Sequence, residues 1–461
     1  MSYSTRLLLG LTLLLPLITV PASAQKSPQP SDYQRFITAI DTGKIEAVQA
    51  EIDRGSDINA REKNLGSRVI TKVYGQTPLM HAASGSYPNP ALELLLDNGA
   101  QVNARDDSGV TALMEAANFN RSGAVKLLLD HGAQVNARSN YGRTPLIIAA
   151  EPRHRNPKKA IAIVKLLLGA GANVDGRNPE AKTPLMVAAG DAYTPEIVPL
   201  LLDHGAEVDA HDRNGVTPLM FAVHDLGFPE IVKLLIEKGA QVDARSNSGS
   251  TPLHRAAQAS TSMFRYIIVE SNRSRSTAVR KESAKRPLNN AQLLLDKGAQ
   301  VDARDEDGNT PLILAAKGSN RPKFIQLLID KGAEVNVRNN DGWTPLMIAA
   351  RGSGWHHDSR NENRSGRLIL RAKGSDKLEF IQLFIEGGAE VNARNNDGWT
   401  PLMIAARWCN NSEIILWLLD NGADATAENK LGKKAIFYAR DNNKALEDTR
   451  ALERLEQLAG E

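Results

Sequence analysis

The chain has 461 residues, of which 42% are hydrophobic and 5% are aromatic, and its formal net charge is +3. This length exceeds one ordinary compact core, so several domains or a repeat array is expected, while the hydrophobic content excludes an intrinsically disordered chain. The small net charge gives no global electrostatic signal, and we expect no nucleic-acid partner.

Residues 1–24 have the pattern of a secretory signal peptide. Arg6 precedes an apolar run at 7–20, and the small residues Ala22 and Ala24 follow it. The run is shorter than the roughly 20 residues that a membrane-spanning helix needs. We therefore expect an exported protein, periplasmic or secreted, with residues 25–31 as a linker. An uncleaved N-terminal anchor is the alternative.

Residues 77–433 repeat one pattern, with a Thr at the start of each unit. In the unit from Thr217, the Thr predicts a helix N-cap and Pro218 the first helical residue. A second helix, "PEIVKLLIEKG", ends at Gly239, and "DARSNSG" predicts a polar turn. Most unit starts are 33 or 34 residues apart. The starts are Thr77, Thr111, Thr144, Thr183, Thr217, Thr251, Thr310, Thr344 and Thr400.

One helix pair of this size cannot bury its own apolar face, whereas stacked neighbours can. The fourteen residues "RNNDGWTPLMIAAR" occur unchanged at 338–351 and 394–407, which indicates one structural slot filled twice. Catalysis needs unlike groups that converge on one point, and a recurring module does not naturally supply them. We therefore expect no enzyme activity. The single cysteine, Cys409, excludes an intramolecular disulfide.

The period and the motifs "DGxTPLMxAA" and "LLLDxGAxVNAR" resemble the ankyrin repeat, similar to exported bacterial ankyrin-repeat proteins. The resemblance implies an all-α repeat solenoid of paired helices with β-hairpin fingers. It also implies a partner protein bound on the fingers and inner helices. Residues 32–76 resemble an N-terminal capping repeat, 77–433 nine repeats, and 434–461 C-terminal capping helices, about eleven units in all. The family's His after "TPL" is present only as His254, so its hydrogen bonds should be largely absent.

Three insertions separate the first and second helices of their units, at about 152–160, 260–286 and 352–375. Their net charges are +4, +5 and +3, so they predict a basic edge on an otherwise acidic solenoid. Such an edge could contact an anionic membrane or envelope surface; solvated flexible loops are the alternative. The candidate contact residues are Arg153, Lys158, Arg280, Lys281, Arg367 and Arg371.

Three aromatic residues are candidate anchors for a partner. Trp343 and Trp399 stand directly before the Thr of their units, and Tyr141 lies near the tip of an earlier turn. Aromatic residues in such places often anchor partners, although each ring could instead pack against the neighbouring finger.

Catalytic and cofactor motifs are missing from the sequence. His356 and His357 are adjacent, but a metal site needs further converging ligands, so we expect no metal and no cofactor. Two hypotheses remain: a monomeric, exported scaffold that binds a protein, and a binder of anionic surfaces.

Overall fold

The computed structural model describes residues 31–61, 75–85, 90–151, 157–190, 194–224, 227–259, 277–318, 322–351, 375–409, 411–443, 446 and 449–460. Throughout these ranges the regular structure is helical, and the helices alternate between a first and a second helix of each unit. The first helices are α1 (Asp32–Asp41), α3 (Pro78–Ser84), α5 (Ala112–Asn118), α7 (Pro145–Ala150), α9 (Pro184–Ala189), α11 (Pro218–Val223), an unlabelled helix at 252–259, α15 (Pro311–Lys317), α17 (Pro345–Ala350), α19 (Pro401–Trp408) and α21 (Ala435–Asn442). The second helices are α2 (Ile45–Asp53), α4 (Pro90–Asp97), α6 (Ser122–Asp130), α8 (Pro157–Gly169), α10 (Ile197–Asp203), α12 (Pro229–Glu237), α14 (Thr277–Asp296), α16 (Pro322–Asp330), α18 (Ser375–Glu386), α20 (Ser412–Asp420) and α22 (Arg450–Ala459).

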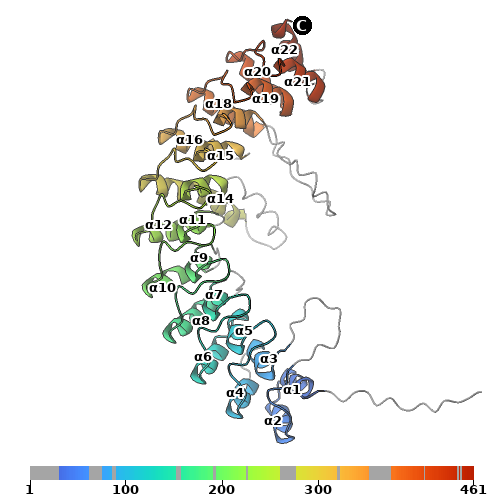
Figure 1. The fold of residues 1–461 in the computed structure, drawn as a ribbon, viewed down its shortest axis with the longest axis vertical. Coiled ribbons are helices and arrows are strands. Elements are labelled where there is room, and N and C mark those ends of the chain that lie inside the picture. The colour runs from blue at the N-terminus through green and yellow to red at the C-terminus, as the bar shows by residue number, and fades with distance from the viewer. Residues whose placement is uncertain are drawn as a thin grey trace, which may run out of the picture.

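The helix pairs stack into a curved array (Figure 1), in which the first helices lie along the inner side of the arc and the second helices along the outer side. Successive first helices contact one another, as α5 contacts α3 and α7, and one continuous core runs through the array, including Leu253 of the helix at 252–259. The chain therefore folds as the repeat solenoid that its period predicts.

The start of each first helix follows from its Thr-Pro sequence. The Thr217 side chain accepts a hydrogen bond from the backbone N of Met220 at 3.4 Å, and Pro218 holds the first helical position. Thr residues cap α3, α5, α7, α9, α15, α17 and α19 in the same way. The predicted N-cap role is confirmed, and Gly239, with φ of 97°, ends its unit's second helix in the left-handed conformation that glycine tolerates.

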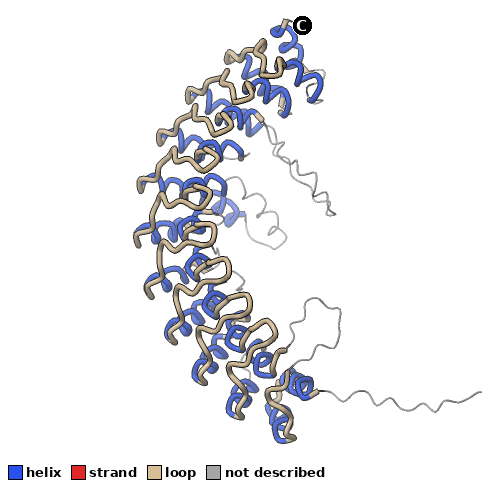
Figure 2. Tube along the Cα trace, in the orientation of Figure 1, coloured by secondary structure: helices blue, strands red, loops and turns tan. Residues whose placement is uncertain are grey.

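The turn between units is held by a buried polar side chain. Asp212 Oδ1 accepts hydrogen bonds from the backbone N of Asn214 at 2.8 Å and of Val216 at 2.9 Å. Two backbone bonds close the turn, from Asp212 N to Val216 O and from Gly215 N to Asp212 O, and another reaches the neighbouring turn, from Arg213 N to Glu180 O. The turns of successive units stack beside one another along the array (Figure 2).

These turns stand where the resemblance predicts β-hairpin fingers, and none of the described residues in them forms a strand. A hairpin ladder needs repeated backbone pairing between its two arms. Here the arms share a single pairing bond, from Asp212 N to Val216 O, and a tight turn from Gly215 N to Asp212 O lies inside it. Other backbone groups bond to the buried polar side chain or to the neighbouring turn. We call these segments fingers, since they hold the predicted place.

An arginine ladder runs along the fingers. The guanidinium of the Arg in "VNAR" donates to the backbone carbonyl at the same position of the next unit, so each finger is tied to its neighbour. The pairs are Arg61 to Arg105, Arg105 to Arg138, Arg138 to Arg177, Arg177 to His211, Arg245 to Arg304, Arg304 to Arg338, Arg338 to Arg394 and Arg394 to Glu428. Charge-assisted bonds of this kind are stronger than neutral ones.

The Asn or Asp two residues before each ladder Arg makes a second link. Asn136 accepts from the backbone N of Asn173 at 2.7 Å and donates to Gly171 O at 3.1 Å. Asp209, at the same position in the central part of the array, accepts from Gln241 N at 3.0 Å. The sequence "VNAR" is therefore an interface between units rather than a recognition motif.

His254 makes the bonds that the resemblance assigns to this position. Its Nδ1 lies 2.8 Å from Thr251 Oγ1, and its Nε2 lies 3.0 Å from the carbonyl oxygen of Asn309 in the next unit. Burial lowers the pKa of His254, so the neutral ring is favoured. In the other units of residues 77–433 a buried apolar side chain, such as Met220, stands in its place.

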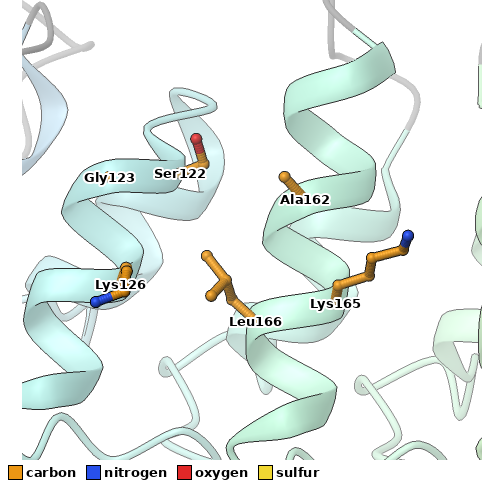
Figure 3. Close-up of a pocket in the computed structure, with 6 residues that line it drawn as sticks. All are labelled: Ser122, Gly123, Lys126, Ala162, Lys165 and Leu166. Carbon is orange, nitrogen blue, oxygen red and sulfur yellow. The ribbon is translucent and has the colours of Figure 1, made fainter.

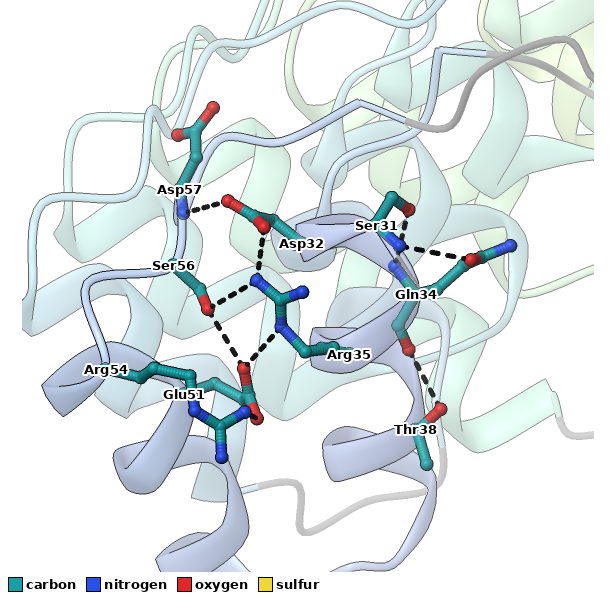
Figure 4. A network of polar contacts seen from close by, with 9 residues as sticks. All are labelled: Ser31, Asp32, Gln34, Arg35, Thr38, Glu51, Arg54, Ser56 and Asp57. Atoms are coloured by element: carbon teal, nitrogen blue, oxygen red, sulfur yellow. Dashed lines mark hydrogen bonds and ion pairs between the residues drawn. The ribbon is translucent and has the colours of Figure 1, made fainter. Parts of the chain in front are cut away.

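At the N-terminal end, α1 and α2 are joined by a polar network (Figure 4). Arg35 Nε donates to Glu51 Oε2 at 3.0 Å, while its Nη2 reaches Ser56 Oγ at 3.2 Å and pairs with Asp32. Glu51 is buried, so these bonds and its pairing with Arg54 compensate its charge. This network is structural, because its members satisfy one another.

Part of two predicted insertions is helical and extends the second helix of its unit. The last residues of the first one, 157–160, form the first turn of α8, and residues 277–286 of the second belong to α14. Pro157 is well placed to begin a helix, since its missing N–H costs nothing there. The rest of the predicted insertions, at 152–156, 260–276 and 352–374, lies outside the described residues.

Candidate partner-binding surface

Aromatic rings and guanidinium groups gather near the C-terminal end of the array. They come from the bases of two fingers and from three first helices. α19 and α21 lie on the inner side of the arc (Figure 1). We call this group the Arg–aromatic cluster; its members are Trp343, Arg351, Trp399, Arg407, Trp408 and Tyr438.

The local fold fixes where each member stands. The buried turn residue Asn339 accepts from the backbone N of Trp343 at 2.9 Å, which holds that Trp at the base of its finger. Arg351 follows directly after α17 as its C-cap residue. The duplicated sequence repeats this arrangement in the next unit, where Asn395 holds the backbone of Trp399 at 2.8 Å.

The rings of the cluster stack on one another across unit boundaries. The Trp399 ring lies 5.2 Å from the Trp408 ring and 4.4 Å from the Tyr438 ring, with interplanar angles of 27° and 30°. Offset stacks at such distances are favourable beyond the area that they bury. The three Trp rings are half-buried, and Tyr438 is buried.

The two arginines lie over these rings. The guanidinium carbon of Arg351 is 4.8 Å from the centroid of Trp408, and that of Arg407 is 4.7 Å from the same centroid. Arg351 also lies 5.7 Å from the Trp343 ring, and Arg407 lies 5.3 Å from the Trp399 ring. These are cation–π distances, so the charges and the rings form one connected surface.

Burial, and then the charge of Arg407, lowers the pKa of Arg351. A lowered pKa means that the charged form of Arg351 is disfavoured, because its surroundings are partly dehydrated and a second positive charge is nearby. Among the residues that the structure describes, no carboxylate lies within ion-pair distance of Arg407. Within the described part of the chain, the positive charge of Arg407 is therefore not paired with a carboxylate.

The candidate anchors of the sequence are not all in one place. The structure brings Trp343 and Trp399 into the same cluster, from segments 56 residues apart in the chain. Their packing against neighbouring side chains, which the sequence leaves as the alternative, is also present. Tyr141 is 67% exposed at the tip of a finger several units away, so it does not belong to the cluster.

Sequence reasoning missed Arg351, Arg407, Trp408 and Tyr438. Both arginines end the duplicated fourteen residues, each eight positions after its Trp, and this fixed spacing was the available signal. Trp408 and Tyr438 lie outside the duplicated segment, and their stacking depends on how α19 and α21 meet.

Little of the predicted basic edge can be placed. Lys158 is exposed in the first turn of α8. Arg280 and Lys281 are in α14, where the backbone alone is described, and Arg153, Arg367 and Arg371 lie outside the described residues. The anionic-surface hypothesis therefore has no described geometry behind it.

The outer side of the arc has a shallow, open depression between α6 and α8, with a volume of about 470 Å³ (Figure 3). It exists because Gly123 and Ala162 face each other with too little side chain to fill the space. The neighbouring Lys126 pairs with Asp130 at 3.0 Å on its own helix. The depression has no converging polar groups and therefore no recognisable site.

Metal ligands do not gather anywhere in the described ranges. His131 and His204 each bond the carbonyl oxygen of the residue four positions earlier, at 2.9 and 2.8 Å, and so belong to helix ends. His356 and His357 lie outside the described residues.

Comparison with known families agrees with the architecture. The family model for ankyrin repeats (3 copies) matches residues 36–139, 79–175, 155–246, 185–278, 278–358 and 354–429, which overlap into one stretch over most of the chain. No curated protein matches the chain. Within the described part of the chain, every helix is too short or too polar to cross a membrane. The helix pairs, the stacked turns and this match show that the chain belongs to the ankyrin-repeat family.

Proposed function

We propose that this chain is a non-enzymatic scaffold that binds a partner protein on the inner side of its arc, through the Arg–aromatic cluster. Ankyrin repeats generally mediate protein–protein interactions. The proposal adds a location for that interaction in this chain, at the inner helices α17, α19 and α21.

One observation carries the proposal. In a chain with only 5% aromatic residues, four aromatic rings and two guanidinium groups converge on one part of the inner side. Trp, Tyr and Arg are the residues most enriched among those that dominate binding energy at protein interfaces. Half-buried Trp rings also lose little conformational entropy when a partner covers them, because their stacking already fixes them.

Site-specific cross-linking tests the location. A photoreactive residue would replace Lys317, exposed at the end of the inner helix α15 beside α17, in one variant and Lys126, on the outer side, in a matched variant. Illumination in the protein's native fraction should give a discrete adduct from position 317 and none from position 126. Adducts from position 126 alone, or equally from both, would move the interface away from the inner side.

Export remains part of the proposal. It rests on the sequence pattern of residues 1–24, which lie outside the described residues. Fractionation of cells that express the full chain, followed by N-terminal sequencing of the protein, should find it outside the cytoplasm and beginning at residue 25.

A further inference from the structure

We propose that the middle of the arc is a built-in hinge, where neighbouring units change their relative tilt more easily than elsewhere along the array. The hinge consists of four successive junctions between units, which begin at Asp175, Asp209, Asp243 and Asp302. This inference goes beyond the proposed function, because it concerns how far the arc opens and closes, wherever a partner binds.

One repeat position distinguishes these junctions in the sequence. It lies two residues before the ladder position of each finger. The helices that the four junctions join, from α8 to α16, occupy the middle part of the arc (Figure 1). The change is confined to this stretch: Asn stands at 59, 103, 136, 336 and 392, whereas Asp stands at 175, 209, 243 and 302.

The amide of an Asn at this position can bond across the junction in two ways. Asn136 accepts from the backbone N of Asn173 and also donates to the carbonyl oxygen of Gly171. Asn59, in the N-terminal capping repeat, makes the accepting bond alone. The donating bond recurs from Asn103, Asn336 and Asn392, to the carbonyl oxygens of Gly132, Gly388 and Gly422 at 3.1, 3.0 and 2.8 Å.

An ionised Asp cannot supply the donating bond, because its side chain has acceptor atoms only. Asp209 instead turns both oxygens to one backbone N, that of Gln241, at 3.0 and 3.2 Å. Asp243 and Asp302 do the same with the next unit, while Asp175 accepts through one oxygen. Among the described residues, no hydrogen bond reaches the four carbonyl oxygens that an Asn would meet, those of Gly205, Gly239, Gly298 and Gly332.

The arginine ladder is interrupted in the same stretch. Its break among the described fingers lies at His211, in the second of the four junctions. That junction therefore lacks both the amide bond and the guanidinium bond. Its fingers are still joined by the backbone bond from Asn247 N to Asn214 O, at 2.8 Å, and by the bonds of Gln241 N to Asp209.

The mechanical consequence follows from the construction of a solenoid. Each unit contacts only its neighbours, so the resistance of the array to bending is set junction by junction. A single exposed hydrogen bond contributes modestly, but here four successive junctions lack the same bond. The apolar core is continuous beneath them and holds the units together. Small changes of tilt are therefore easiest in the middle, where the fingers are tied least.

The test supplies the missing donors in the full chain. The Asn variant combines Asp175→Asn, Asp209→Asn, Asp243→Asn and Asp302→Asn. The Ala variant changes the same four positions to Ala, which removes the charges without adding a donor. The end variant, Asn336→Asp with Asn392→Asp, removes amide donors outside the hinge and is the matched control. Circular dichroism spectra would show that each variant is folded.

Spin labels on either side of the hinge report the tilt between units. They are attached at Lys126→Cys in α6 and Lys323→Cys in α16, two exposed positions on second helices, in a Cys409→Ala background. Pulsed electron paramagnetic resonance then gives the distribution of distances between the two labels. Hydrogen exchange of the Gln241 amide is a second, local measurement of how often the junction opens.

The Asn variant should have a narrower distance distribution than the unaltered chain. Its Gln241 amide should exchange about fivefold more slowly, as one added hydrogen bond implies. The Ala variant should be no narrower than the unaltered chain, and the end variant should match the unaltered chain between these labels. An unchanged width in the Asn variant would overturn the hinge. Equal narrowing in the Asn and Ala variants would also overturn it, since charge repulsion and not the missing donors would then set the tilt.

Discussion

At the scale of single residues, Glu115 in α5 is an unusual member of the inner side. Burial, with a smaller contribution from the charge of Asp106, raises its pKa from 4.5 to about 7. A carboxyl whose pKa is higher in the folded state favours folding while it is protonated. Its contribution is fully present below pH 4.5 and is lost as pH rises through about 7.

Replacement of Glu115 by Gln should therefore have little effect on the free energy of unfolding near pH 4.5. Above pH 7 the variant should be more stable than the unaltered chain by roughly 2 kcal/mol, because Gln carries no buried charge. Urea unfolding at pH 4.5, 6 and 8 measures the difference. Glu93→Gln, at an exposed position of α4, is the control and should show no such pH dependence. A constant difference between the Glu115 variant and the unaltered chain at all three pH values would contradict the assignment.

Residue-scale features divide clearly into those that sequence can and cannot predict. Thr217 as an N-cap and Gly239 as a helix end are set by the few residues around them, so the sequence predicts both. The stacking of Trp399 on Tyr438 joins two units and depends on how their side chains pack. The repeat motif does not predict that contact, because Tyr438 lies in the C-terminal capping segment, which lacks the motif.

At the scale of elements, the arginine ladder has one break among the described fingers. His211 takes the place of the ladder Arg, and its own ring has no hydrogen bond to the next finger, whereas Arg177 before it and Arg245 after it both make theirs. The two fingers beside the break are still joined by the backbone bond from Asn247 N to Asn214 O.

His211→Arg should restore the missing bond, to the carbonyl at position 245. The expected gain is about 0.5–1 kcal/mol, since a hydrogen bond to an exposed charged group contributes modestly. Thermal unfolding followed by circular dichroism measures it. His211→Lys supplies the charge without the planar fork of donors and should gain less. If the Lys variant is stabilised as much as the Arg variant, the effect comes from charge and not from the ladder.

Element boundaries show why the sequence does not predict the helical part of the second insertion. The residues 277–286 carry many charges and no apolar stripe, so the sequence gives no reason to join them to the following helix. In the structure they extend α14 toward its N-terminus. Helix propagation adds one backbone bond per residue once a helix is nucleated, so a packed helix can extend into a segment that would not form one alone.

At the scale of the whole molecule, stability is expected to be local, because each unit contacts only its neighbours. The Arg–aromatic cluster lies next to the C-terminal pair α21 and α22, and α22 contacts both α20 and α21. Leu455 is fully buried in α22, and the ion pair of Arg454 with Asp420, at 2.7 Å, joins α22 to α20. In the described part of the chain, α21 and α22 are packed against other units on one side only. The position of Tyr438 in α21 therefore depends on this last helix pair.

Leu455→Ala should lower the free energy of unfolding of the C-terminal units by about 2–5 kcal/mol, since it removes fully buried side-chain volume. Leu128→Ala, at an equally buried position of α6, is the matched control. Hydrogen exchange read by mass spectrometry should show reduced protection in α19 to α22 for the first variant and in α4 to α8 for the second. The yield of the cross-linked adduct with the partner should fall in the Leu455 variant alone, because only that change loosens the helix that holds Tyr438. Equal loss of protection along the whole array in either variant would show that the units unfold together, and the cluster would then owe its geometry to the entire solenoid rather than to its last few units.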